Sequence, residues 1–192
     1  PAWIHGYTAD FTGTVKYTVS GGMLYSAGGT VIIQERGAPE EGADEGTVMP
    51  FGQRYFFDHY PSTVTAIATD AAGAICATGD NSGSVFVWET ATSSPSLKKA
   101  VINSPYGTIT KLSLSRCGTT LAVIGSDDVN TLTVYDVSDF SAVVVKTTYA
   151  LGAGSVADVA LCGLSTFLAV ACATDSSCGT GIDVFTSEDS WT

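Results

Sequence analysis

His59 is the side chain with the widest chemical reach, because an imidazole serves as a general base, a metal ligand or a buried hydrogen-bonding group. No second histidine or cysteine stands at the spacing of a metal site, so we expect a structural histidine held by buried partners. Oxygen-rich turns suit calcium, and two are present. Their members are Asp80, Asn81, Asp127, Asp128 and Asn130. We favour turn stabilisation by these side chains, so we expect no metal and no cofactor.

The loop GDNSGS, residues 79–84, faintly resembles the nucleophile loop of a serine protease. Its extra Asn81 breaks that pattern, and no companion His–Asp arrangement accompanies it. The sequence therefore predicts no catalytic residues and a protein that is not an enzyme. The turns Asp80–Gly83 and Asp127–Asn130 remain candidates for contacts with a partner, because loops carry most binding residues.

The charge balance limits the classes of partner. Acidic residues outnumber basic ones by 19 to 8, for a formal net charge of −11, and no Lys/Arg-rich patch is visible, so we expect no nucleic acid. The apolar runs are far shorter than the roughly 20 residues of a membrane span, so we expect no membrane partner. An acidic insert at 36–53, with Glu40 and Glu41, predicts an exposed loop that is solvated or contacts a basic partner.

Cysteine usage and the start of the chain bear on its compartment. The five cysteines lack CxxC spacing and mostly lie in apolar stretches, which favours reduced core residues, with Cys172 and Cys178 the pair closest to a plausible bridge. The chain begins at Pro1 without a basic and then apolar leader, so we expect no signal peptide and a fragment or processed chain.

The candidate residues lie within a sequence repeat of about 45 residues. The segment Val64–Ala68, VTAIA, recurs as ITKLS from Ile109 and as VADVA from Val156, at spacings of 45 and 47 residues. Glycines 73, 118 and 163 recur at 45 and 45 residues. Each copy then ends in a β-branched residue followed by an aromatic one, in VFVW, LTVY and IDVF. A fourth, divergent unit precedes the three copies, with four short β-rich runs.

A period near 45 residues filled with short β-rich segments and Gly/Asp/Asn/Ser turns is typical of a four-stranded propeller blade. The sequence predicts an all-β fold, a partial β-propeller of about four four-stranded blades that belongs to a larger propeller or is covered by partners. We assign residues 1–60 to a divergent first blade with the 36–53 loop. Three further blades follow, at residues 61–104, 105–150 and 151–192. The last of these leaves open an incomplete blade.

The second unit resembles a WD repeat. The resemblance implies a buried network of a His before the blade, a hydroxyl on its second strand, an Asp in the next turn and a Trp on the third strand. His59, Thr78 and Trp88 match, while the Asp position falls on Ser82, with Asp80 nearby. The third and fourth copies lack the His and carry Tyr135 and Phe185 in place of Trp, so we expect packing to stabilise them.

The order of the N-terminal motifs is more specific. WIHGYTADFTGTVKYTVSGGMLYSAGGTVIIQE, followed by QRYFFDHYPSTVTAIATD, resembles the hydrophobic motif and first blades of the echinoderm microtubule-associated protein-like family, from about Trp3 to Val145. The resemblance implies a non-catalytic protein of the cytoplasm and cytoskeleton, or of the ciliary or flagellar axoneme, that binds tubulin, microtubules or other microtubule-associated proteins. The alternative is a general propeller adaptor in a signalling, transport or ubiquitin complex.

Overall fold

The computed structural model describes residues 6–8, 10–18, 21–36, 51–91, 99–163, 166–174 and 181–188. All regular structure in these residues is β-strand, and the fifteen strands form four antiparallel sheets. Within the described part of the chain, no helix is long and apolar enough to cross a membrane. The all-β fold that the sequence predicts is therefore correct.

Each sheet is one blade, built from consecutive strands in the order of the chain. Blade 1 contains β1 (Val15–Tyr17), β2 (Met23–Ala27), β3 (Thr30–Arg36) and β4 (Phe51–Phe56). Blade 2 contains β5 (Val64–Thr69), β6 (Ile75–Asp80), β7 (Ser84–Glu89) and β8 (Lys99–Asn103). Blade 3 contains β9 (Ile109–Leu114), β10 (Thr120–Gly125), β11 (Thr131–Asp136) and β12 (Val144–Ala150). Blade 4 contains β13 (Ser155–Leu161), β14 (Phe167–Thr174) and β15 (Gly181–Thr186), three strands among the described residues.

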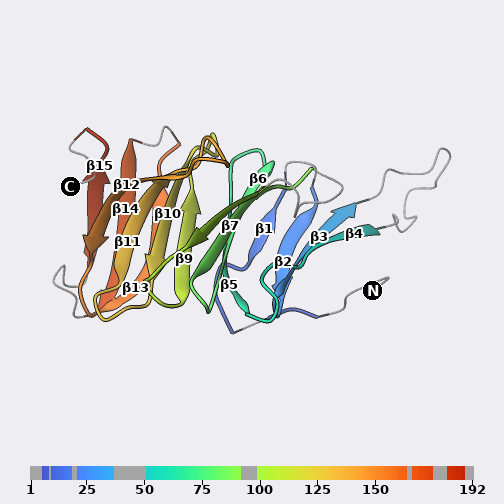
Figure 1. Cartoon of the computed structure of the whole chain (residues 1–192), viewed down its shortest axis with the longest axis horizontal. Helices are drawn as coiled ribbons and strands as arrows, with labels where there is room; N and C mark the ends of the chain where they lie inside the picture. The colour runs from blue at the N-terminus through green and yellow to red at the C-terminus, as the bar shows by residue number, and fades with distance from the viewer. Residues whose placement is uncertain are drawn as a thin grey trace.

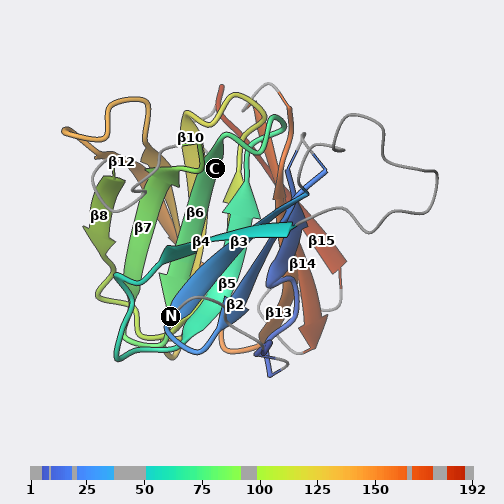
Figure 2. The same cartoon turned by 90° about the vertical axis from the view of Figure 1, so that its right-hand side faces the viewer.

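The blades stack face to face in chain order, from blade 1 in blue to blade 4 in red (Figure 1). Figure 2 looks onto blade 1 and shows the later blades behind it. The first strands of the blades are neighbours, since β5 packs against both β1 and β9, and β9 packs against β13. These four inner strands therefore surround the axis of a partial propeller.

The position of each blade in the stack explains its hydrophobic pattern. All six residues of β10 are buried, because blade 3 is covered on both faces by blades 2 and 4. Strand β6 is nearly as buried, between blades 1 and 3. A strand enclosed on both faces needs no polar side, which is why the sequence shows continuous apolar runs in place of strict alternation.

Two of the periodic glycines have the turn geometry that the repeat predicts. Gly73 and Gly118 follow the first strand of their blades and have φ angles of 60° and 73°. Their amides donate to the carbonyls of Asp70 and Ser115 at 3.1 and 2.9 Å. An L-residue with a Cβ strains in this left-handed region, so glycine permits the tight reversal.

The acidic insert of blade 1 is shorter than the sequence analysis predicts. Strand β3 continues to Arg36 and β4 begins at Phe51, with Glu35 opposite Gly52 and Arg36 opposite Phe51. The ladder extends past the apolar residues because each residue there has a backbone N–H and C=O that can join it. Glu40 and Glu41 lie outside the described residues, as does Cys178. Of the other cysteines, Cys76 and Cys172 are buried and burial raises the pKa of the Cys76 thiol.

Candidate functional site

A buried hydrogen-bond network lies at the start of blade 2. The His59 Nδ1 atom is 2.7 Å from Asp80 Oδ2, and its Nε2 atom is 2.8 Å from Thr78 Oγ1. The indole N–H of Trp88 donates to the same Thr78 hydroxyl at 3.2 Å. All four residues are at most 2% exposed. The structure therefore brings His59, Thr78 and Trp88 together, as the sequence analysis expects.

The donors and acceptors of this network balance with a neutral imidazole. Asp80 offers only acceptors when ionised, so we assign the ring proton to Nδ1, which donates to the carboxylate. Nε2 then accepts the Thr78 hydroxyl proton, and that hydroxyl oxygen accepts the Trp88 N–H. Every polar atom in the chain from Trp88 to Asp80 has a partner, which is the condition for burying such a network without penalty.

Asp80, and not Ser82, is the acidic member of the network. Thr78 and Asp80 are two residues apart on β6, so their side chains share the face that receives His59. Ser82 supports the carboxylate instead, since its hydroxyl and amide donate to Asp80 Oδ1 at 2.6 and 2.8 Å. The Ser84 amide donates to the same oxygen at 3.0 Å. The sequence assignment of Ser82 was therefore wrong, because the strand runs two residues closer to the turn than the alignment implied.

These bonds set the ionisation of Asp80. Burial alone would raise the pKa of the Asp80 carboxyl, but the hydrogen bonds from His59, Ser82 and Ser84 lower it below the ordinary value. The carboxylate therefore stays charged at neutral pH. Because its side chain is only 1% exposed, Asp80 is not the surface contact that the sequence analysis predicted.

Aromatic rings enclose the network. Phe56, at the end of β4 in blade 1, stacks on Trp88 with ring centroids 4.7 Å apart. Phe86 meets the His59 ring edge to face at 4.6 Å and Phe56 at 5.6 Å. These rings belong to the core between blades 1 and 2. The network therefore joins two blades in addition to bracing one, a role for Phe56 that the sequence analysis did not foresee.

Asp80, His59 and Thr78 form an acid, imidazole and hydroxyl array of the kind used in nucleophilic catalysis. The sequence analysis found no His–Asp companion for the GDNSGS loop, yet this pair exists and serves Thr78 in place of Ser82. The array is unsuited to catalysis, because each reactive atom is buried and the Thr78 hydroxyl already has two partners. Its geometry supports a structural role.

Other blades keep the positions without the network. Val123 of blade 3 and Val170 of blade 4 stand where Thr78 stands in blade 2, judged by strand register. Tyr135 and Phe185 take the Trp88 position and join apolar clusters. In blade 1, Ser26 lies beside Leu24 on the face of β2 that packs against blade 2, and its hydroxyl is buried without a hydrogen-bond partner. Packing stabilises blades 3 and 4, in agreement with the sequence analysis.

The second predicted turn, Asp127–Asn130, is held by its own side chains. Asp127 accepts the Thr131 amide and hydroxyl, both at 2.6 Å. Asn130 has a φ of 47°, and its side-chain amide donates to the Gly152 carbonyl at 2.9 Å. Asp128 is exposed. Among the described residues no group of three or more His, Cys, Asp or Glu side chains could hold a metal ion.

The two turns lie on one face of the stack, where each is bonded to the loop that enters the next blade. The Asn81 side chain accepts the Thr63 amide at 3.0 Å, and its carbonyl accepts the Thr108 hydroxyl at 3.2 Å. The Thr108 carbonyl in turn accepts the Ser126 amide at 2.9 Å. We call this the turn face, made by 57–63, 80–84, 104–108, 126–130 and 151–154. These bonds across blades hold its turns in fixed relative positions.

A groove opens beside the turn face along the inner strands. Its central part has a volume of about 190 Å³ and is lined by all four blades. The charged groups there are Lys16 on β1, Lys111 on β9 and Asp158 on β13. This site was not predicted from the sequence, because single charges on strands far apart in the chain give no local signal.

Comparison with known proteins bears on the fold. No protein-family model matches the chain, and no curated protein does. Among solved structures, the crystal structure of the Cps50 (Swd1) β-propeller domain of Myceliophteria thermophila is similar, with a TM-score of 0.58 and 15% identity. The match covers 95% of this chain and 72% of that one. The chain has the fold of a partial WD-repeat β-propeller. At this identity the likeness concerns the fold alone, and the propeller's function rests on its own surface.

Proposed function

We propose that this propeller is a non-catalytic scaffold whose turn face binds protein partners. The observation that carries the proposal is the bonding of the turn face from blade to blade, through Asn81, Thr108 and Ser126, above the buried His59 network. A surface held in one conformation loses little entropy on binding, so its turns are preorganised for a partner. Strand side chains are largely used in packing, which leaves turns and loops for recognition.

The chemistry of the described residues favours binding over catalysis. The one acid, imidazole and hydroxyl array is sealed in the core, and the inner groove offers two lysines and an aspartate with no imidazole or thiol among its central lining residues. The WD-repeat fold is used mainly by scaffolds, and fold alone assigns no partner.

For the partner, we propose tubulin, within a microtubule or with other microtubule-associated proteins, in the cytoplasm, the cytoskeleton or an axoneme. The support is the ordered resemblance of the N-terminal motifs, from about Trp3 onward. Trp3 itself lies outside the described residues. A general adaptor in a signalling, transport or ubiquitin complex is the second candidate, and the rigid turn face serves it equally well.

Charge makes the partner testable. Tubulin is acidic and this chain carries −11, so approach is slowed by repulsion and binding depends on local contacts. Asp128→Lys on the turn face should tighten co-pelleting with microtubules by removing one local repulsion. Asp139→Lys makes the same charge change on the β11–β12 turn at the opposite edge, and should have no effect beyond that of net charge.

The outcomes separate the two candidates. Co-pelleting that responds to Asp128→Lys more than to Asp139→Lys supports tubulin bound at the turn face. Equal responses indicate bulk electrostatics and contradict the turn face as the contact. Absence of co-pelleting at physiological salt contradicts the tubulin proposal, and cross-linking in cells with a probe placed at Asp128 then identifies the adaptor's partner.

A further inference from the structure

The groove along the inner strands is continuous with the turn face. Its first end is lined by Asp10, Thr12 and Thr108, and Thr108 belongs to the turn face. Its central part is lined by Lys16, Lys111 and Asp158, and its far end continues to Thr69 and Ser113. A partner bound at the turn face therefore has a path for an extended segment along the propeller axis.

Two ammonium groups in this groove lack a carboxylate partner among the described residues. The half-buried Lys111 donates to the Thr12 hydroxyl at 3.1 Å, and Lys16 is half-buried on β1. By contrast, Arg54 is paired with Glu35 and Lys146 with Asp136. Each ammonium group is therefore able to form a charge-assisted hydrogen bond with a bound carboxylate.

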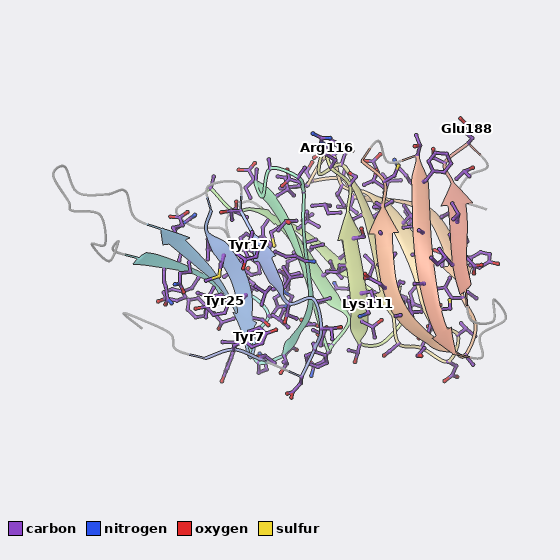
Figure 3. The ribbon with its side chains drawn as sticks, turned by 180° about the vertical axis from the view of Figure 1, so that it is seen from behind. Tyr7, Tyr17, Tyr25, Lys111, Arg116 and Glu188 are labelled. Atoms are coloured by element: carbon purple, nitrogen blue, oxygen red, sulfur yellow. The ribbon has the colours of Figure 1, made fainter. Side chains whose placement is uncertain are left out.

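The location of the lysines is notable in a chain with only eight basic residues. Lys16 and Lys111 come from strands of blades 1 and 3, and the fold brings them to one groove. Figure 3 shows Lys111 on β9, between the blue strands of blade 1 and the orange strands of blade 4, with Arg116 at the other end of that strand. Lys16 and Lys111 share the groove with Asp158 in its central part and with Asp10 at its first end.

The remaining lining fits a peptide better than a small anion. Threonine hydroxyls and apolar side chains such as Ile67 and Leu112 both line the groove, which suits the mixed backbone and side-chain surface of an extended chain. Asp158 adds direction, because it repels an acidic side chain at blade 4 while the lysines attract acidic side chains between blades 1 and 3.

We propose that the inner groove binds an extended acidic peptide segment, with carboxylate side chains paired to Lys16 and Lys111. The proposal rests on the scaffold function and names the chemistry of the segment that the partner inserts beside the turn face. It also explains how an acidic propeller accepts an acidic partner, since the attraction is local to the groove.

The test uses the 192-residue chain and fluorescein-labelled hexaglutamate, with binding followed by fluorescence anisotropy. Lys16→Gln and Lys111→Gln should each weaken the affinity about tenfold, the loss typical of one charge-assisted hydrogen bond. Affinity should also fall steeply with salt. Arg116→Gln is the matched control, because it removes one positive charge from an exposed turn away from the groove and should leave the affinity unchanged. Circular dichroism melts verify that each variant is folded.

Several results would overturn the proposal. The first is no binding of hexaglutamate, and the second is an equal loss of affinity in Arg116→Gln. The third is displacement of hexaglutamate by inorganic phosphate to the same extent as in the lysine variants, which would make the groove a small-anion site. Tighter binding of a labelled oligonucleotide would replace the peptide by nucleic acid. The scaffold function is judged separately. Co-pelleting that responds to Asp128→Lys but not to Lys111→Gln supports partner binding at the turn face and contradicts the groove proposal. Hexaglutamate binding in the groove, with no protein partner found for the turn face, supports the groove proposal and contradicts the scaffold function.

Discussion

Trp88 of blade 2 stacks flat on Phe56 of blade 1, with ring centroids 4.7 Å apart and ring planes 5° from parallel. Both side chains are fully buried. The same indole also donates to Thr78, so one residue connects the core between two blades with the polar network of its own blade. Packing and hydrogen bonding at this point are consequently coupled.

Phe56→Ala should destabilise the protein strongly, because it removes a buried ring and leaves a cavity beside Trp88. The expected loss is about 3–5 kcal/mol in the free energy of unfolding, measured by urea denaturation. Phe57→Ala is the matched control, since the neighbouring ring is 43% exposed and its removal should cost less than about 1 kcal/mol. Equal losses for the two variants would contradict the role of Phe56 between the blades.

His59→Ala should cost about 1–3 kcal/mol, because Asp80 Oδ2 loses its donor and the Thr78 hydroxyl proton loses its acceptor in a buried site. The double variant His59→Ala with Asp80→Ala should cost less than the sum of the two single variants, because both single changes remove the same hydrogen bond between His59 and Asp80. Thermal melts and urea titrations measure both quantities. An unchanged melting temperature in His59→Ala would show that the network is not stabilising.

The repeat made the blades predictable, whereas the partner of His59 was only partly so. Apolar runs and glycines at a period of 45 residues locate the three later blades to within a few residues. The acidic position was misplaced because alignment to a repeat does not say where a strand ends. The period of two along β6 could have corrected it, since Thr78 and Asp80 share one face.

The inner groove illustrates a different limit. Lys16 and Lys111 are 95 residues apart, and each alone reads as a solvated charge. Only the stacking of the first strands brings them into one groove. The same holds for Phe56, whose contact with Trp88 depends on how blade 1 sits on blade 2. Local patterns predict elements, and contacts between blades require the fold.

Ser26→Ala should leave the free energy of unfolding unchanged or raise it slightly. The Ser26 hydroxyl is buried on the face of β2 that packs against blade 2, and it has no hydrogen-bond partner. Removing an unsatisfied buried hydroxyl relieves its desolvation cost. Thr78→Ala is the matched comparison and should destabilise, because the Trp88 and His59 nitrogens lose their partner. A loss in Ser26→Ala as large as that in Thr78→Ala would indicate a partner for Ser26.

Stability should fall in acid through Asp80. Its pKa is lower in the folded protein than in the unfolded chain, so its contribution is present above the unfolded value of about 4 and is lost as the pH falls through the folded value. Urea unfolding across this range should therefore show a smaller acid dependence in Asp80→Asn. Asp128→Asn serves as control, because it removes one carboxylate from an exposed turn outside the network. A larger change of slope in the control would contradict the assignment.

The outer face of blade 4 should drive self-association at high protein concentration. Ile182 and Val184 are 69% and 59% exposed on β15, while Phe185 between blades 3 and 4 is buried. They stand opposite Ala171 and Ala169 of β14, so neighbouring strands form a continuous apolar surface. Such a surface on an open stack normally packs against another sheet.

Val184→Lys should lower the apparent mass in light scattering at high concentration. Val101→Lys, at a residue 50% exposed on β8, should not. A wild-type chain that stays monomeric under the same conditions would contradict this prediction, whereas association lowered equally by both variants would place its cause in net charge rather than in blade 4.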